Sequence, residues 1–193
     1  NRFTDKGWNE IDRAYCAGEI GSREAYSRVV SLFKGTKTQM LEFVSAMGKV
    51  DPYFPEFYMY CREKGLDIKI VSDGLDFYID EIMRKYHLQD IEHFSNVLVF
   101  RNGNALSIRF PHMNIQCEKC GTCKSGVLKE YRGSYERVIY VGNGYSDVCP
   151  AKDADIVFAK EVLYEKCRQN GTACVWYENF HDIRAFLEKS VLI

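Results

Sequence analysis

The chain has 193 residues, a formal net charge of −1 and 46% hydrophobic residues. A chain of this length suits one α/β domain with a small appendage and can bury a sizeable core. The balanced charge gives no electrostatic reason to expect nucleic acid or an anionic membrane as a partner, and no apolar run reaches the roughly 20 residues of a membrane span.

The start of the chain, Asn1 to Trp8, shows neither an initiator methionine nor a basic and apolar leader. We therefore expect no secretion signal, and a chain that either has been trimmed or starts part-way through its gene product. The eight cysteines occur in a chain of ordinary apolar content, which favours reduced thiols in a cytoplasmic protein over a disulfide framework.

Residues 1–50 are predicted to form three short amphipathic helices without strands, because their apolar residues recur at helical spacing. Ser22 is the candidate N-cap of the second helix, and either Thr36 or Thr38 could start the third. The predicted helices cover residues 8–16, 22–35 and 36–48. The aromatic side chains of this region are expected to be core residues rather than substrate contacts: Trp8, Tyr15, Tyr26 and Phe33.

From about residue 66 onward strands and helices alternate, which predicts an α/β fold with a doubly wound parallel sheet. The predicted strands cover residues 67–72, 138–141, 156–159 and 173–177, with a β-hairpin at 96–110 that turns at Asn102 and Gly103. The predicted helices cover residues 56–64, 75–86, 124–131, 147–152, a segment that ends at 169, and 182–189. We divide the chain into a helical cap, residues 1–50, and an α/β core, residues 51–193.

Polar residues stand at three places where an apolar strand ends or a helix begins. Ser72-Asp73-Gly74 follows the first strand, Lys124 opens a helix, and Asp147 follows the strand that ends in Gly142-Asn143-Gly144. A hydroxyl with neighbouring amides and a lysine can bind a phosphate, and a carboxylate suits Mg²⁺. Because ligands bind at the carboxyl ends of parallel strands, we expect these groups to converge on one phosphate and one divalent cation.

These segments resemble the haloacid-dehalogenase (HAD) phosphatase superfamily, in its phosphoserine-phosphatase-like branch. Residues 71–78 look like its second motif and Cys123-Lys124 like its third, so the resemblance makes Ser72, with Asp73 and Gly74, and Lys124 phosphate-binding residues. Residues 140–150 look like its fourth motif, which implies that Asp147 and Asn143 bind Mg²⁺. The residues around these motifs are most similar to those of methionine-salvage phosphatases and of phosphoethanolamine/phosphocholine phosphatases. The resemblance also implies that residues 1–50 form the family's cap.

Two departures from the family pattern concern the chemistry. The fourth motif usually reads Gly-Asp-Gly, and Asn143 removes one anionic metal ligand. The first motif, Asp-x-Asp after a strand, supplies the family's nucleophile and its general acid/base. Its literal match, Asp153-Ala154-Asp155, precedes an apolar strand instead of following one, and we reject it. We therefore predict that this chain lacks the catalytic Asp pair.

The missing motif has a consequence for the sheet, because in family members its strand lies between the strands that end at Ser72 and Gly142. We expect that another segment fills this position or that the sheet is distorted there. We also expect a truncated phosphatase that hydrolyses no phosphate ester by itself.

Cys117, Cys120 and Cys123 have a spacing that suggests a zinc site, although a structural zinc usually takes four ligands. The alternative is a set of reduced thiols in a loop. Two other functions stay open: a non-catalytic phosphate-binding or regulatory HAD-like protein, and a redox or zinc-linked interaction module. The expected partners are a small phosphorylated metabolite and a second copy of the chain as a homodimer.

Overall fold

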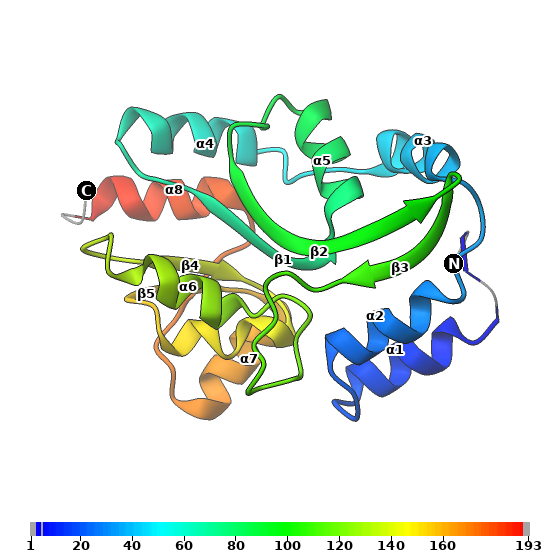
Figure 1. Ribbon diagram of the computed structural model, residues 1–193. Helices are drawn as coiled ribbons and strands as arrows, with labels where there is room; N and C mark the ends of the chain where they lie inside the picture. Colours follow the sequence, from blue (N-terminus) through cyan, green and yellow to red (C-terminus); the bar gives the residue numbers. More distant parts are fainter. Residues whose placement is uncertain (1–2, 5, 191–193) are drawn as a thin grey trace. The chain divides into compact units, whose positions relative to one another are not determined.

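The computed structural model describes residues 3–4 and 6–190, and these fall into two compact units (Figure 1). Unit 1 comprises Asn1–Lys49 and Lys69–Cys123, and unit 2 comprises Val50–Ile68 and Lys124–Ile193. The expected division into a cap, residues 1–50, and a core, residues 51–193, stays a prediction.

Unit 1 contains a three-stranded sheet in the order β1-β2-β3, in which β2 is parallel to β1 and antiparallel to β3. Its elements are α1 (Trp8–Cys16), α2 (Ser22–Val30), α3 (Lys37–Met47), β1 (Lys69–Leu75), α5 (Asp76–Lys85), β2 (Glu92–Arg101) and β3 (Asn104–Arg109). Asn102 and Gly103 connect β2 to β3 with φ angles of 51° and 79°, as a two-residue hairpin turn requires.

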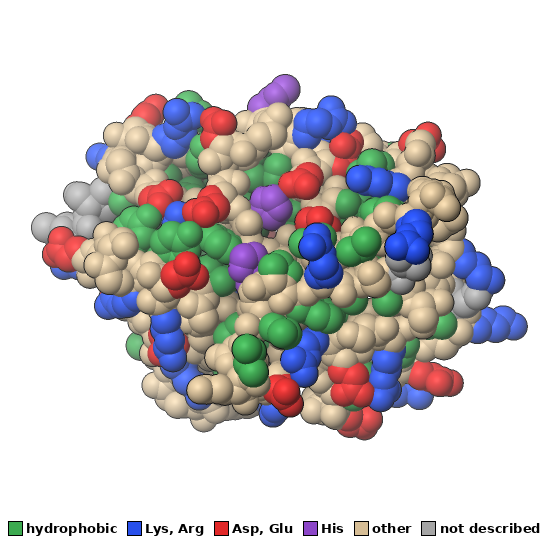
Figure 2. Space-filling model, in the orientation of Figure 1, with side chains coloured by type: hydrophobic (Ala, Val, Ile, Leu, Met, Phe, Trp, Pro, Cys, Tyr) green, Lys and Arg blue, Asp and Glu red, His purple; other side chains and the backbone are tan. Residues whose placement is uncertain are grey.

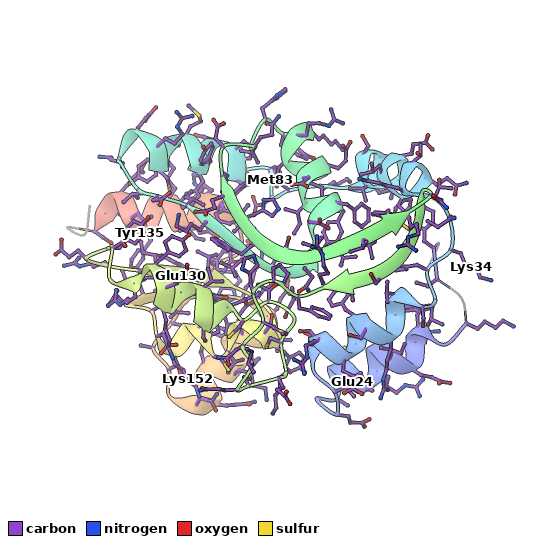
Figure 3. All side chains as sticks on the ribbon, in the orientation of Figure 1. Glu24, Lys34, Met83, Glu130, Tyr135 and Lys152 are labelled. Carbon is purple, nitrogen blue, oxygen red and sulfur yellow. The ribbon has the colours of Figure 1, made fainter. Side chains whose placement is uncertain are left out.

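Helix α5 packs on β1 and β2, α3 packs on α5, and α2 packs on α1 and β3. The buried face of α5 includes Ile79 and Met83, the latter labelled in Figure 3. At the C-terminal end of α3, Lys85 Nζ donates hydrogen bonds to the carbonyl oxygens of Ser45 (2.8 Å) and Gly48 (2.9 Å). A cation there is favoured by the helix dipole, so this contact fastens α3 to α5.

Unit 2 contains a parallel sheet in the order β4-β5-β6. Its elements are α4 (Phe54–Glu63), α6 (Lys124–Arg132), β4 (Ile139–Gly142), two 3₁₀ turns (Tyr145–Asp147 and Pro150–Lys152), β5 (Ile156–Ala159), α7 (Glu161–Asn170), β6 (Val175–Trp176) and α8 (Phe180–Lys189).

Strand β5 carries the core of unit 2 on both of its faces, because successive side chains point to opposite sides of a sheet. Phe158 belongs to a cluster with residues of α4 and α8, including Phe57 and Ile183. Val157 and Ala159 belong to a second cluster with Leu163 of α7. The continuous apolar run 156–159 is therefore that of a strand covered on both faces, as a parallel sheet requires.

The α/β class and the hairpin are confirmed, and Thr36 is the N-cap of α3, with a reciprocal capping box to Gln39. Three details were wrong. Gly21 is the N-cap of α2, and the Ser22 hydroxyl instead accepts a hydrogen bond from the Gly121 amide (3.0 Å). The helix expected at 147–152 is two 3₁₀ turns, and the last strand has two residues instead of five.

The described strands form two three-stranded sheets, one in each unit, and not one continuous sheet. A continuous sheet of these strands in family order would have contradicted the expectation of a missing or replaced strand. The expectation that another segment takes the place of the missing strand, or that the sheet is distorted there, stays a prediction.

No helix among residues 3–4 and 6–190 is both long and apolar enough to cross a lipid bilayer. On the face shown in Figure 2, basic and acidic side chains are interspersed. This agrees with the balanced charge of the sequence.

Candidate functional site

The Ser72-Asp73-Gly74 segment lies within β1 and not after it, because the strand runs on to Leu75. The register of β1 against β2 shifts between Val71 and Leu75, so the three residues form an irregularity in the ladder. The Gly74 amide donates to Ser72 Oγ (3.0 Å). Since this bond uses Ser72 Oγ as an acceptor, the hydroxyl proton is left to donate elsewhere.

A buried polar network holds Asp73. The side chain of Asn96 donates to the Asp73 carbonyl oxygen (2.7 Å), and the Thr122 amide donates to Asp73 Oδ1 (2.8 Å). Thr122 Oγ1 also donates to Asn96 Oδ1 (3.1 Å). Asn96 and Thr122 have no exposed surface, and buried polar groups with satisfied hydrogen bonds specify one arrangement. The network therefore fixes the backbone next to Ser72.

A cavity of about 230 Å³ lies beside Asp73 in unit 1. Its lining comes from α1, α2 and β1: Trp8, Ile11, Asp12, Tyr15, Ser22, Ala25, Tyr26, Val29 and Asp73. Asp73 Oδ2 is buried without a hydrogen-bond partner in the described part of the chain. Trp8, Tyr15 and Tyr26, which we expected to be core residues, thus line a cavity, and none of the three is fully buried.

In unit 2 the side chains of Lys124 and Asp147 form an ion pair. Lys124 is the first residue of α6, Asp147 follows β4, and their side chains are only 12% and 5% exposed. The distance from Lys124 Nζ to Asp147 Oδ1 is 2.6 Å. The structure therefore brings these two predicted site residues together, whereas Ser72, Asp73 and Gly74 belong to unit 1.

Both oxygens of the Asp147 carboxylate accept hydrogen bonds. The Tyr140 hydroxyl donates to Oδ1 (2.7 Å), and the amides of Asn143 and Gly144 donate to Oδ2 (2.9 and 2.8 Å). Burial alone would raise the pKa of Asp147, but the charge of Lys124 and these hydrogen bonds lower it below its usual value. Asp147 is therefore a buried carboxylate that stays ionised.

Gly142 is required by the way in which Asp147 folds back on β4. A Cβ atom at position 142 would lie 2.7 Å from Asp147 Cγ and 2.8 Å from Oδ2. Any side chain there would displace the carboxylate, so the first glycine of Gly-Asn-Gly makes room for Asp147.

The predicted magnesium ligands have suitable chemistry, since carboxylate and amide oxygens are hard donors. The side-chain nitrogen of Asn143, Nδ2, donates to Glu161 Oε2 (2.9 Å). The side-chain oxygen of Asn143 would therefore be its metal-ligand atom. Asp147 already accepts four hydrogen bonds, one of them from a lysine. A cation at Asp147 would have to compete with Lys124 for Oδ1.

The zinc site suggested at Cys117, Cys120 and Cys123 was wrong for this structure. Among residues 3–4 and 6–190, no three side chains of the His, Cys, Asp and Glu types are placed to hold a metal ion. Cys117 lies exposed in a loop, and Cys123 is bonded through its amide to the His112 carbonyl oxygen (2.7 Å). The loop therefore does not bring the three thiols together around one metal position.

The literal Asp-x-Asp match has a structural role. Both Asp155 oxygens accept from the Arg132 guanidinium (2.6 and 2.7 Å), and Oδ2 also accepts from the Val138 amide (2.7 Å). These contacts, the Val138 amide first, lower the pKa of Asp155. Asp153 lies 3.5 Å from Lys129 Nζ. Asp155 thus ties the end of α6 to the segment before β4.

We predict that Asp155→Asn lowers the free energy of unfolding by about 1 kcal/mol, because it removes one charge-assisted acceptor at a partly exposed site. Urea denaturation at pH 7 measures this change. Phosphate binding should stay the same, and a loss of phosphate affinity by more than tenfold at unchanged stability would assign Asp155 to the site instead.

Sequence reasoning assigned no supporting role to four side chains that hold these groups: Tyr140, Glu161, Asn96 and Thr122. Asn96 carried a signal, since it opens an otherwise apolar strand run. Tyr140, Glu161 and Thr122 looked like ordinary strand, helix or loop residues, because only the folded chain brings them to their partners.

The chain matches the family model described as Putative Phosphatase over residues 23–168. The chain belongs to this family. A relative from Brevibacillus brevis, a 2-hydroxy-3-keto-5-methylthiopentenyl-1-phosphate phosphatase, is 26% identical over 191 residues, which is 97% of this chain and 86% of that protein. An enzyme of the same name from Exiguobacterium sibiricum is 29% identical over 149 residues, covering 76% of this chain and 67% of that protein.

Two solved structures show the fold. The phosphoserine phosphatase from T. onnurineus in complex with NDSB-201 has a TM-score of 0.69 at 20% identity and covers 94% of this chain and 80% of that chain. A substrate-bound phosphoserine phosphatase complex has a TM-score of 0.72 at 18% identity and covers 94% and 84%. The HAD fold expected from the motifs is thereby confirmed.

Proposed function

We propose that the protein is a Mg²⁺-dependent phosphatase of small phosphomonoesters. The observation that carries the proposal is the buried Lys124–Asp147 pair, 2.6 Å apart, at the ends of α6 and β4. A lysine held by one buried carboxylate is an oriented cation for a phosphate group. The family match and the names of the relatives support the same activity.

In this proposal different residues of the chain would bind the phosphate group and the Mg²⁺ ion. The Ser72 hydroxyl would donate to a phosphate oxygen, and Lys124 would neutralise part of the phosphate charge. The Gly74 amide already donates to Ser72 Oγ, so its part is to orient that hydroxyl. Asp147 and the side-chain oxygen of Asn143 would hold Mg²⁺, which when bound supplies further positive charge for the phosphate.

The cavity beside Asp73 is the place that we propose for the organic part of the substrate. Its volume of about 230 Å³ lies below the range of pockets for drug-sized ligands, which fits a small ester. Asp12 and Asp73 are its charged side chains. Two carboxylates disfavour a substrate whose organic part carries a negative charge.

The alternative is a non-catalytic, phosphate-binding or regulatory HAD-like protein. Asn143 in place of the usual acid, and the absence of an Asp-x-Asp motif after a strand, favour this alternative. Ser72 and Lys124 serve binding as well as catalysis.

An activity assay separates the two functions. We expect no turnover of p-nitrophenyl phosphate or of small natural phosphomonoesters by the 193-residue chain with Mg²⁺, because the nucleophilic Asp pair is not in its sequence. A longer chain in which Asp-x-Asp after an apolar strand precedes Asn1 should hydrolyse these esters with Mg²⁺ and be inhibited by EDTA. Turnover by the 193-residue chain would contradict the absence of its nucleophile, and no turnover by the longer chain would favour the non-catalytic alternative.

A further inference from the structure

Glu161, the first residue of α7, contacts the loop that follows β4. Its carboxylate accepts a hydrogen bond from Asn143 Nδ2 over 2.9 Å. The backbone at the start of α7 makes two further bonds to this loop. The Lys160 amide donates to the Gly142 carbonyl oxygen (3.3 Å), and the Leu163 amide donates to the next carbonyl oxygen along the loop (3.1 Å). The start of α7 therefore holds the loop through its backbone, and Glu161 adds a charged side-chain contact.

Glu161 reaches Asn143 from a backbone conformation that is unusual for its residue type. Its φ angle is 51°, in the left-handed region that favours glycine. A residue with a side chain is strained in this region, and such strain is concentrated at sites where function requires one geometry. Glycine would be unstrained at position 161, but it would bring no carboxylate to Asn143. The strain and the contact together point to a role for this carboxylate.

Three polar atoms of Asn143 are held by hydrogen bonds in a way that directs the fourth, Oδ1. The backbone amide donates to Asp147 Oδ2 (2.9 Å), the backbone carbonyl oxygen accepts from Leu163, and Nδ2 donates to Glu161. An ionised carboxylate accepts hydrogen bonds and cannot donate them, so Glu161 can face only the Nδ2 end of the carboxamide. Oδ1 is therefore turned away from Glu161, and an oxygen is the atom that Mg²⁺ requires.

The charge of Glu161 also acts on Asn143 Oδ1. An amide N–H that donates to a carboxylate is polarised, and the carbonyl oxygen of the same amide becomes a stronger electron donor. Asn143 is neutral, so by itself it offers a cation a weaker ligand than a carboxylate does. The contact with Glu161 places a negative charge directly behind this ligand.

We propose that Glu161 is a positioning residue of the cation site: it holds the Asn143 side chain with Oδ1 available to Mg²⁺, and it supplies the negative charge that asparagine lacks. This inference rests on the proposed Mg²⁺-binding role of Asn143. Glu161 itself need not touch the ion, because its effect passes through the Asn143 carboxamide. The acid that the Gly-Asn-Gly turn lacks is thus supplied from a position 18 residues later.

The test is a titration of the 193-residue chain with MgCl₂, followed by the NMR signal of the Gly144 backbone amide. Glu161→Ala removes the acceptor and its charge, so we expect about a tenfold loss of Mg²⁺ affinity. Glu161→Gln keeps a neutral acceptor of the same length and should lose about threefold. Glu165→Ala is the matched control, because Glu165 is an exposed acid one turn later on α7. It should bind Mg²⁺ as the wild type does.

A double-mutant cycle separates positioning from a long-range effect of charge. The Asn143→Asp side chain has no N–H to donate, so in this background Glu161→Ala should change the Mg²⁺ affinity by less than twofold. A tenfold loss in that background would overturn the inference, because Glu161 would not act through the Asn143 amide. A loss matched by Glu165→Ala, or a Glu161→Ala variant that binds Mg²⁺ like the wild type, would overturn it as well.

The amide spectrum of each variant shows that it is folded, and the Asn143 side-chain amide gives a direct view of the contact. Without Mg²⁺, its proton signal should move upfield in Glu161→Ala, because a hydrogen bond to a carboxylate is lost. An unchanged signal would contradict the contact itself. If Mg²⁺ does not shift the Gly144 signal of the wild type, the proposed cation site fails and the inference fails with it.

Discussion

Replacing Asp147 by Asn should lower the free energy of unfolding by about 3–5 kcal/mol, the largest stability effect that we expect from one substitution in unit 2. The substitution keeps the shape of the side chain but removes the charge opposite Lys124, whose side chain is only 12% exposed. It also places an amide N–H₂ among four hydrogen-bond donors. Urea denaturation at pH 7 measures the loss.

The pH dependence of stability supplies a second test of the same residue. Because the pKa of Asp147 is lowered in the folded state, its stabilisation is complete above the unfolded value of about 3.9 and is lost as the pH falls through the lowered folded value. The wild type should therefore lose stability below about pH 4, and Asp147→Asn should lose less there.

The controls separate the ion pair from a general charge effect. Asp153→Asn removes a carboxylate 3.5 Å from Lys129 in the same unit, and it should change stability by about 0.5 kcal/mol or less. Adding Lys124→Met to Asp147→Asn should restore part of the loss, since it removes the uncompensated cation. An Asp147→Asn variant as stable as the wild type would contradict a structural role for the pair.

Replacing Lys124 by Met should give the largest functional effect, a loss of about tenfold to hundredfold in affinity for inorganic phosphate. The reason is that Lys124 is held in one orientation by Asp147, so its charge is directed and little side-chain entropy is lost on binding. Titration calorimetry at constant ionic strength measures the change, because salt screens exposed charges.

Lys129→Met is the matched control for this prediction. Lys129 lies on the same helix, but its side chain is 66% exposed. If both variants lost affinity equally, the effect would be one of overall charge, and Lys124 would have no direct contact with phosphate.

The sequence by itself determined the fold class and identified three candidate polar groups of the site. Hydrophobic runs such as 156–159 and the alternation of strands and helices are local signals, because they reflect which residues a covered strand or an amphipathic helix must contain. Ser72, Lys124 and Asp147 were recognisable for the same reason, since each stands next to such a signal.

Only the tertiary structure decided how these groups are held. The hydrogen bonds from the Asn96 side chain and from the Thr122 amide to Asp73 join residues that are 23 and 49 positions apart, and these separations carry no period or motif. The Tyr140 hydroxyl donates to Asp147, seven residues later, only because the chain folds back after β4. Such bonds depend on the packing of whole elements, so no local pattern predicts them. The same reason explains why the spacing of three cysteines could not decide between a zinc site and reduced thiols, and the loop forms no zinc site among the described residues.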